Sequence, residues 1–382
     1  MTGRQLSADV LVVGGGLAGC ATAYFLARDG VDVLLIEQQD LNMLASGANA
    51  GGIHGQIPHE MFREEGEAWT RFFAPTLPLM LASADLWAGF EAELGADIEF
   101  SRCGGLLVAE TEAQMLEIAR KSEIDLEFGV DVELLDRSDL RSFAPYLADH
   151  LVGGAYCPNE AKANPLLATP ALANAAHSHG ARIMRQTRLE ALEPTQSGFL
   201  ATTTAGDVHA GKVVNCAGAM AGRVAAMVGF DLPIQGYPIQ VNVTEPAAPL
   251  VPLLLYSGGE RLTLKQTPRG AFLIGGGWAA RIDPTSGLPV VDHHSVVENL
   301  RYAIAAVPQL EHVQLVRTWA AMVNGTRDWR PVLGTTDRVK DFYMCMFPWM
   351  GFTGGPIAAR IVADMVLGRE PQFDLSPFAL TG

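Results

Sequence analysis

Closely spaced cysteines are absent from this chain. Its five cysteines stand far apart, and none forms the C-x-x-C pair that zinc sites, iron–sulfur clusters and redox disulfides use. The histidines offer no better ligands, because His177 and His179 lie two residues apart on a predicted helix and so point to different sides. His293 and His294 follow Asp292 at a predicted helix start, where a solvated turn is expected. We therefore predict buried, unpaired thiols and no metal site.

Basic residues and long apolar runs are also scarce. The 27 Lys and Arg residues face 42 Asp and Glu residues, which gives a net charge of −15. This balance argues against nucleic acid or an anionic membrane surface as a partner. No stretch approaches the ~18 consecutive apolar residues of a membrane span, and residues 1–9 lack the apolar core of an export signal. We expect a cytoplasmic protein with no membrane span.

A dinucleotide-binding fingerprint stands near the N-terminus. Val10–Val13 is predicted to be a buried strand, and the glycines of Gly14–Gly19 follow it at G-x-G-x-x-G spacing. Leu17–Arg28 is predicted to be the helix that they open. In such a turn the first glycine permits the tight bend, the second admits a pyrophosphate and the third lets helix and strand pack closely. The phosphate would meet free amides at the helix N-terminus.

A second predicted strand completes this unit. Val31–Ile36 follows the helix at once and ends on Glu37. An acid at this place accepts hydrogen bonds from a ribose diol and repels a 2′-phosphate. Because strand, glycines, helix, strand and acid occur together, the pattern is far stronger than a glycine triplet alone.

Two further glycine-rich segments suit a nucleotide site. The run 45–55 is mostly Gly, Ala and Ser, which is typical of a segment that lies flat against a planar ligand; a flexible loop is the alternative. Gly351–Pro356 is predicted to open a helix over 357–367, and free amides there would favour negative charge on the ligand. The expected cofactor contacts are Gly14, Gly16, Leu17, Ala18, Gly19, Glu37, Gln38, Ser46, Gly47, Ala48, Asn49, Ala50, Gly51, Gly52, Ala217, Gly218, Gly351, Phe352, Thr353 and Gly354.

The rest of the chain alternates between two patterns. Apolar residues at helical spacing predict helices over 61–73, 77–94 and 166–180. Alternating, apolar or glycine-containing segments predict strands over 98–109, 124–135, 182–184, 199–204, 238–244, 262–265, 271–275 and 342–346. The segment 211–220 is predicted to be a buried strand that runs into small residues and a helix start. A length of 382 residues exceeds the ~250–300 at which a single core stops growing, so we expect two domains.

The bound dinucleotide is predicted to be FAD. The chain has one fingerprint, no second one for a nicotinamide and no redox cysteine pair, so the electrons must pass directly from a small substrate. We predict an α/β plus α+β fold, with a Rossmann-like FAD-binding domain formed by 1–90, 145–225 and 325–382. Residues 91–144 and 226–324 would form a substrate-binding domain built on an antiparallel sheet.

Five segments, in order, resemble the D-amino-acid oxidase family of FAD-dependent amine oxidoreductases. They are Val10–Glu37, Ser46–Gly51, Val213–Met220, Thr326–Gly334 and Gly351–Pro356. That family includes glycine oxidase, sarcosine oxidase, D-amino-acid dehydrogenase and the FAD subunits of heteromeric proline, hydroxyproline and opine dehydrogenases, to which the likeness is greatest. The resemblance covers nearly the whole chain. It implies oxidation of a C–N bond by hydride transfer to flavin N5, followed by hydrolysis of the imine.

The chain departs from this family where the substrate carboxylate binds. Glycine oxidase and D-amino-acid dehydrogenases carry an arginine in a W-A-x-L-R-P context, and here 319–324 reads W-A-A-M-V-N, which puts Val323 at that position. The tyrosine that often assists from the sheet above the flavin corresponds to Thr263. We therefore expect N-substituted or cyclic amino acids as substrates, such as an opine, hydroxyproline, proline or sarcosine.

Another cation must bind a carboxylate, if one is bound. Arg327 and Lys265 are the first candidates, and Arg330 and Arg261 are further ones; arginine is preferred for a bidentate clamp. His54 is the expected polar group beside the reacting amine, as a base or an orienting group, although a histidine that only satisfies backbone groups is an alternative.

The electron acceptor is the last expectation. Sarcosine oxidases place a lysine against the flavin to help reduce dioxygen, and the matching positions here are Leu273 and Ile274. Without a cation there, we expect a dehydrogenase that acts as one subunit of a hetero-oligomer, with other redox subunits as partners. Phe347, Trp349 and Met350 are candidates for the docking surface, and for at least one of them packing in the core is the favoured alternative. The alternatives are a stand-alone glycine or D-amino-acid oxidase, and a FAD-carrying subunit with little catalysis of its own.

Overall fold

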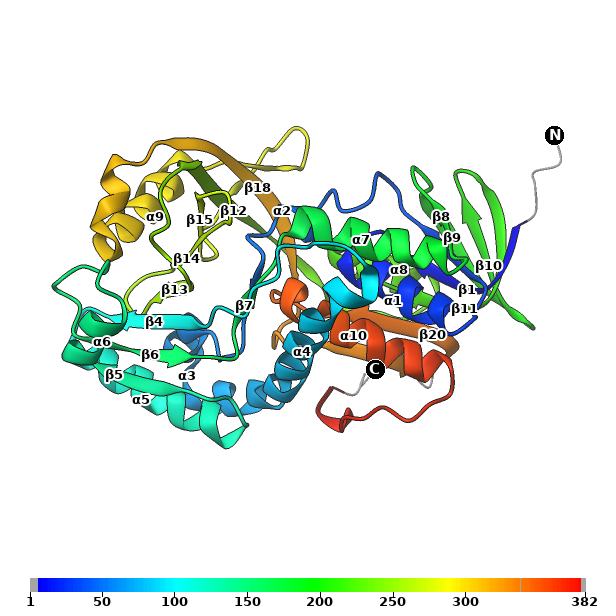
Figure 1. Cartoon of the computed structure of the whole chain (residues 1–382). Coiled ribbons are helices and arrows are strands. Elements are labelled where there is room, and N and C mark those ends of the chain that lie inside the picture. The colour runs from blue at the N-terminus through cyan, green and yellow to red at the C-terminus, as the bar shows by residue number, and fades with distance from the viewer. Residues whose placement is uncertain (1–5, 337, 379–382) are drawn as a thin grey trace.

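The protein is built around two eight-stranded sheets that lie side by side (Figure 1). The computed structural model describes residues 6–336 and 338–378. In the first sheet the strands follow the order β19 (Val332–Thr336), β20 (Val339–Met346), β11 (Gly206–Asn215), β1 (Leu6–Val13), β2 (Val33–Ile36), β8 (Arg182–Met184). The hairpin of β9 (Leu189–Thr195) and β10 (Gly198–Thr203) completes this sheet, with β10 paired to β11. The second has the order β18 (Leu315–Gly325), β12 (Gln235–Pro246), β15 (Ala271–Gly275), β14 (Thr263–Gln266), β13 (Leu254–Ser257), β4 (Gly105–Ala109), β6 (Gly153–Cys157), β5 (Glu133–Asp136).

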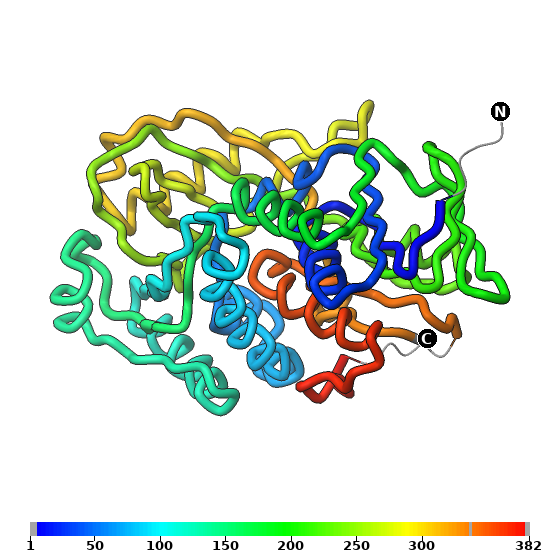
Figure 2. Tube along the Cα trace, turned by 45° about the vertical axis from the view of Figure 1, so that its right-hand side comes forward, coloured from blue at the N-terminus to red at the C-terminus, as the bar shows by residue number. Residues whose placement is uncertain are grey.

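The first sheet is parallel at its centre and covered on both faces. β1 pairs in parallel with β2 and β11, as expected for strands joined by helical crossovers. Val10 and Val12 of β1 pack toward helices α1 (Leu17–Arg28), α4 (Leu77–Leu94), α7 (Pro165–Ser178) and α10 (Gly351–Val366). Leu11 and Val13 point the other way, to α8 (Ala221–Met227) and the β9–β10 hairpin. Figure 2 shows α1, α7 and α10 close together at this end of the molecule.

The second sheet is antiparallel except where β13 pairs in parallel with β4. Its outer face carries α9 (His293–Ala306) and α6 (Arg137–Phe143), whose apolar residues join those of β13, β14 and β15. Helices α3 (His59–Phe73) and α5 (Glu112–Glu127) lie below it in Figure 1. The remaining elements are the short helix α2 (Ala45–Ala48) and the strand pairs β3 (Gly52–Ile53) with β7 (Ala161–Lys162) and β16 (Arg281–Ile282) with β17 (Pro289–Val290).

Three predicted elements differ from the structure. Of 98–109 only Gly105–Ala109 is a strand, and 124–135 is the end of α5 followed by a loop and the beginning of β5. Helix α5 forms because Thr111 caps its N-terminus by accepting from the backbone of Gln114, and because Ile118, Ser122 and Asp125 share one buried face. The C-terminal helix begins at Gly351 rather than at 357.

Helix α10 tolerates a proline close to its start because a side chain from another helix donates a hydrogen bond to the carbonyl that the proline leaves without a partner. Pro356 cannot donate to the carbonyl of Phe352 four residues earlier. The indole Nε1 of Trp87 on α4 donates to that oxygen at 3.2 Å instead. Ser83, also on α4, donates its hydroxyl to the carbonyl of Thr353 at 2.5 Å. The first turn of α10 is therefore tied to α4.

The predicted fold class is confirmed: a Rossmann-like α/β part stands beside a part built on a largely antiparallel sheet. The exact domain boundaries stay a prediction; β6, in the segment we assigned to the FAD-binding domain, hydrogen-bonds to β4 and β5 of the second sheet. Within residues 6–336 and 338–378 we find no helix with the length and apolar character needed to cross a membrane.

Candidate active site

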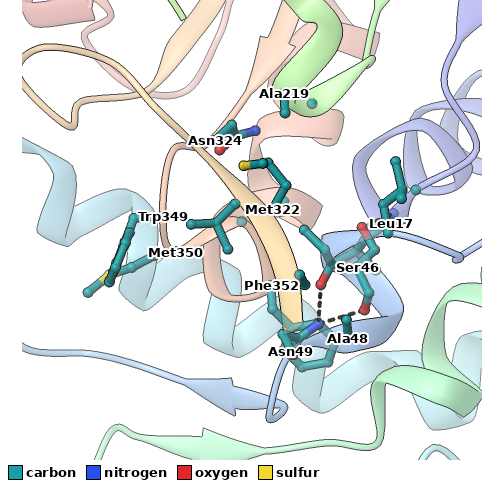
Figure 3. Close-up of a pocket in the computed structure, with 18 of the residues that line it drawn as sticks. Leu17, Ser46, Ala48, Asn49, Ala219, Met322, Asn324, Trp349, Met350 and Phe352 are labelled. Atoms are coloured by element: carbon teal, nitrogen blue, oxygen red, sulfur yellow. Dashed lines mark hydrogen bonds between the residues drawn. The ribbon is translucent and has the colours of Figure 1, made fainter. Parts of the chain in front are cut away.

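One cavity of about 620 Å³ runs between the two sheets. Its lining comes from the fingerprint turn, the Gly/Ala-rich segment, the first turn of α10 and the inner face of the second sheet. Figure 3 shows Leu17, Ser46 and Phe352 on one side of it and Met322 and Asn324 of β18 on another. The cavity thus meets the carboxyl ends of the parallel strands, where ligands of doubly wound sheets bind.

The fingerprint turn leaves room for a ligand at the start of α1. Gly14 has φ +112°, which a side chain rarely adopts, and a Cβ there would come within 2.5 Å of the Cys216 carbonyl oxygen. Gly16 is the N-cap of α1 and carries no side chain that caps the helix. Ser46 accepts from the backbone of Leu17 at 2.9 Å. The glycines therefore add no side chain of their own at this helix start, and Ser46 is the side chain that reaches its amides from outside.

Glu37 ends β2 at the same edge of the cavity. Its carboxylate accepts from the backbone N–H of Gly15 at 2.7 Å and of Gln39 at 2.8 Å. These two bonds fix the carboxylate and leave it lining the cavity. A ribose diol is the kind of donor that such a carboxylate binds.

The Gly/Ala-rich segment is held from both sides. Asn49 donates to the carbonyls of Ser46 and Ala45 on α2 (Figure 3) and accepts from Gly51 N–H at 2.7 Å. Trp319 of β18 donates its indole N–H to the Ala48 carbonyl at 2.7 Å. The second sheet therefore fixes the segment that lines the first sheet's side of the cavity.

His54 stands directly after this segment and faces the cavity. Its backbone N–H donates to the Thr353 hydroxyl at 2.9 Å, which links it to the first turn of α10. Its ring nitrogen Nδ1 lies 2.8 Å from the Tyr256 hydroxyl of β13. Burial, together with the charge of Lys265, lowers the pKa of His54 to about 4. The imidazole is therefore neutral at neutral pH.

Tyr256 continues the contact to a buried acid. Its hydroxyl donates to Oε2 of Glu160 at 2.8 Å. Glu160 is fully buried, and its other oxygen accepts from the backbone N–H of Gly55 at 2.9 Å and of Gln56 at 3.3 Å. Burial raises the pKa of Glu160, and these donors oppose the rise. The sequence patterns did not point to either side chain, because Glu160 follows a turn and Tyr256 lies within a strand of only four residues.

Lys265 of β14 lines the cavity with only 5% of its surface exposed. Its Nζ lies 3.5 Å from the Ala163 carbonyl and close to Gly51, where an added Cβ would approach it within 2.6 Å. Burial, and then the charge of Lys162, lowers its pKa to about 7. A titrating cation therefore stands beside the Gly/Ala-rich segment.

The other predicted cations lie elsewhere. Arg327 is exposed and does not line the cavity, because the turn after β18 is closed by Thr326 donating to Asp328 and leaves Arg327 outside. Arg330 pairs with Asp328 at 3.1 Å, and Arg261 pairs with Glu64 at 2.8 Å. Neither of these two lines the cavity. Lys265 is thus the one member of the four in the cavity wall.

Three glycines predicted to contact the cofactor have a packing role instead. Gly19, Gly47 and Gly354 do not line the cavity. A Cβ on Gly19 would overlap the Gly14 carbonyl, one on Gly47 the Asn42 carbonyl, and one on Gly354 the Phe347 ring. The other cofactor-binding candidates line it: Gly14, Gly16, Leu17, Ala18, Glu37, Gln38, Ser46, Ala48, Asn49, Ala50, Gly51, Gly52, Ala217, Gly218, Gly351, Phe352 and Thr353.

Phe347 is buried, which agrees with the core-packing alternative and removes this residue from the candidate docking surface. It packs beneath Gly354 and lines the cavity with Trp349 and Met350, which are half-buried. Trp349 meets Trp329 edge to face, with ring centroids 5.3 Å apart. The apolar residues in this segment therefore serve the cavity wall.

The residues present fit FAD. The helix start at Gly16, which has no side chain of its own, the crowded Gly14 that only glycine satisfies, and the fixed carboxylate of Glu37 form a cradle for a pyrophosphate and a ribose. The long cavity continues from there to His54 and Lys265. Its size is that of a cofactor site.

Comparisons with known proteins agree with this fit. The family model described as FAD dependent oxidoreductase matches residues 9–365. Glycine oxidase of Geobacillus kaustophilus is 30% identical over 381 residues, which cover 98% of this chain and 96% of that protein. The beta subunit of sarcosine oxidase from an Arthrobacter species is 27% identical (98% and 90% covered), and a subunit of opine oxidase from Rhizobium meliloti is 28% identical (97% and 96% covered).

The solved structures give the same answer. The crystal structure of glycine oxidase from Geobacillus kaustophilus has a TM-score of 0.87 at 27% identity, over 98% of this chain and 99% of that one. Family match and fold thus coincide over nearly the full length. The chain belongs to the FAD dependent oxidoreductase family and is an enzyme that works with FAD.

Proposed function

We propose that this enzyme oxidises the C–N bond of a small N-substituted or cyclic amino acid, such as an opine, hydroxyproline, proline or sarcosine. The observation that carries the proposal is the apolar side chain of Val323 in the cavity wall, 8% exposed, where the family resemblance expects a carboxylate-binding arginine. Similarity to glycine oxidase and to subunits of sarcosine oxidase and opine oxidase supports C–N chemistry in general.

We propose that FAD is held along the cavity in the order of its lining. Gly14–Gly16 and the start of α1 would take the pyrophosphate, and Glu37 the ribose. The segment Ser46–Gly52 and the first turn of α10 would enclose the flavin ring. When bound, FAD supplies the acceptor for the hydride and its two electrons.

The chain's own residues would then orient the substrate. His54 faces the cavity next to Thr353 and would contact the amine. Lys265 is the cation of the second sheet in the cavity wall and would attract the substrate carboxylate. The iminium left on the substrate would be hydrolysed by water.

For the electron acceptor, our first proposal is a redox centre in a partner subunit, so that the enzyme works as a hetero-oligomeric dehydrogenase. Two relatives, from sarcosine oxidase and opine oxidase, are named as single subunits. The five cysteines of this chain are free thiols, so they form no disulfide that could pass the electrons on. The cytoplasmic location stays a prediction. Lys265 favours a second candidate, an oxidase that is reoxidised by dioxygen, because a cation in the cavity stabilises developing superoxide.

Two measurements test these proposals. Anaerobic FAD-loaded protein should bleach with sarcosine, proline, hydroxyproline or an opine faster than with glycine; bleaching by glycine alone would reject the substrate class, and no bleaching would favour a carrier role without catalysis. The substrate-reduced protein is then exposed to air, alone and with an artificial acceptor. Rapid reoxidation by oxygen with no gain from the acceptor would establish the oxidase.

A further inference from the structure

Three side chains from three parts of the fold form a hydrogen-bonded chain that ends in the cavity. Glu160 comes from the turn before β7, Tyr256 from β13 and His54 from the segment after β3. The contacts are 2.8 Å from Glu160 Oε2 to the Tyr256 hydroxyl and 2.8 Å from that hydroxyl to His54 Nδ1.

The donors around Glu160 favour its ionised form. Three donors surround its two oxygens: the backbone N–H of Gly55 and of Gln56 at Oε1, and the Tyr256 hydroxyl at Oε2. A carboxylate accepts from all three, whereas a protonated acid would donate its own proton to the Tyr256 oxygen and turn that hydroxyl toward His54. Burial raises the pKa of Glu160 and the three donors oppose the rise; we take the ionised form, which uses all three.

The charge of Glu160 in turn fixes the protons of the other two groups. The single hydroxyl proton of Tyr256 points to Glu160, so its oxygen can only accept from His54. Nδ1 of His54 then carries the ring proton, and Nε2 keeps its lone pair. In residues 6–336 and 338–378 the hydrogen bonds of His54 run through its backbone N–H and Nδ1, and the residue lines the cavity. Nε2 is therefore the ring atom left to accept from a ligand.

We propose that Glu160 and Tyr256 are positioning residues that hold His54 as a hydrogen-bond acceptor for the single N–H of a neutral secondary amine substrate. This inference rests on the proposed function and sharpens its substrate class. A neutral secondary amine has one N–H and one lone pair. When His54 accepts the N–H, the lone pair stays free to form the C=N bond as the hydride leaves.

The acceptor discriminates among amines. A tertiary amine has no N–H to give to Nε2. A primary amine has a second N–H, which must find its own acceptor among the other polar residues of the cavity wall, such as Asn324 and Gln240. The chain of three side chains therefore favours amines that carry an N–H over amines that carry none.

The variant Glu160→Gln reverses the polarity of the chain without changing its shape. Because two backbone N–H groups hold the Oε1 position as an acceptor, the new amide nitrogen replaces Oε2 and donates to Tyr256. Tyr256 then donates to Nδ1, and Nε2 becomes an N–H that faces the cavity. Tyr256→Phe instead removes the link and leaves the imidazole free to take either form.

The experiment compares substrates with isosteres that lack the N–H, sarcosine with (methylthio)acetate and proline with tetrahydro-2-furoate. In Glu160→Gln we expect kcat/KM for the amine to fall about 10²-fold and the isostere, which can only accept, to bind about tenfold more tightly. In Tyr256→Phe we expect kcat/KM for the amine to fall as well, but the isostere should bind no more tightly than to the wild-type enzyme. Glu67→Gln, in a surface ion pair with Arg71, is the matched control and should change neither.

The outcomes separate this inference from the proposed function. If the wild-type enzyme oxidises secondary amines but Glu160→Gln weakens amine and isostere alike, the inference is wrong and the function stands. If no amine bleaches the wild-type flavin, the function fails. Nitrogen-15 NMR of the wild-type protein, with His54 assigned from its loss in His54→Gln, reads the tautomer independently: a proton on Nδ1 supports the proposal, and a proton on Nε2 overturns it.

Discussion

Lys265 lies directly opposite Leu273 in the antiparallel pair of β14 and β15. Both residues line the cavity. Leu273 is a position where sarcosine oxidases were expected to carry a lysine, and here its cross-strand neighbour is a lysine instead. Ile274, the other candidate position, packs in the core on the opposite face of the sheet. The cavity therefore does hold a cation, one strand away from the position that we compared with sarcosine oxidases.

Replacing Lys265 with methionine should slow reoxidation of the reduced flavin by dioxygen by about 10²-fold, because the ammonium that stabilises superoxide is lost. The pKa of Lys265 is lowered to about 7, so the wild-type rate should fall as pH rises through about 7, where the ammonium loses its proton. In Lys265→Met this fall should disappear. Stopped-flow mixing with oxygenated buffer between about pH 6 and 9 measures both effects.

The matched control is Lys162→Met. Lys162 lies on the neighbouring β7, donates to the carbonyls of Pro252 and Gln266, and does not line the cavity. An equal loss in both variants would mean that the effect comes from net charge or from packing, and not from a cation in the cavity.

Replacing Glu37 with alanine should weaken FAD binding by about 1.5–3 kcal/mol, the usual contribution of hydrogen bonds to a charged group. The carboxylate is fixed by the Gly15 and Gln39 amides and faces the cavity. Equilibrium dialysis or fluorescence release of FAD measures the change. Asp32→Asn, which loosens only the exposed pair with Arg182, should keep wild-type affinity, and unchanged FAD retention in Glu37→Ala would reject the ribose assignment.

Sequence reasoning succeeded where function depends on a local pattern. The unit from β1 to Glu37 is written in consecutive residues, so the glycine spacing and the terminal acid could be recognised directly. It failed where function depends on strand register. Tyr256 lies opposite Thr263 in the β13–β14 pair. Thr263 is the position where the family often has a tyrosine, and no local sequence pattern shows that the neighbouring strand supplies a tyrosine beside it. The same holds for Glu160, whose partners are 96 and 105 residues away.

Replacing Lys121 with methionine should cost about 3–5 kcal/mol of unfolding free energy, because it leaves a buried carboxylate unpaired. Lys121 and Asp125 are both fully buried, and Nζ donates to Asp125 at 2.7 Å and to Gln56 at 2.8 Å. The double variant Lys121→Met/Asp125→Asn should be less destabilised than the single one. Urea denaturation tests this, with exposed Lys340→Met as the control; equal losses in single and double variants would contradict the explanation.

Replacing Trp87 with phenylalanine should destabilise the protein by about 1–3 kcal/mol. Pro356 has no N–H to donate to the Phe352 carbonyl, so this carbonyl loses its donor when the indole is removed. Trp69→Phe is the control, since Trp69 is half-buried and stacks on Phe73. Thermal unfolding of both variants measures the difference. If both lose the same stability, the aromatic volume matters and the hydrogen bond does not.

The tie between α4 and α10 also constrains when the enzyme can mature during its synthesis. Trp87 and Ser83 bind carbonyls that are some 265 and 270 residues further along the chain, and β1 needs β11 as its neighbour. A nascent chain that has emerged only as far as β18 has the fingerprint turn but neither the Thr353 hydroxyl that holds His54 nor the α10 side of the cavity. Cofactor loading is thus expected only after the first turn of α10 has emerged, and a ribosome stalled before residue 353 would carry a protein that cannot retain its flavin.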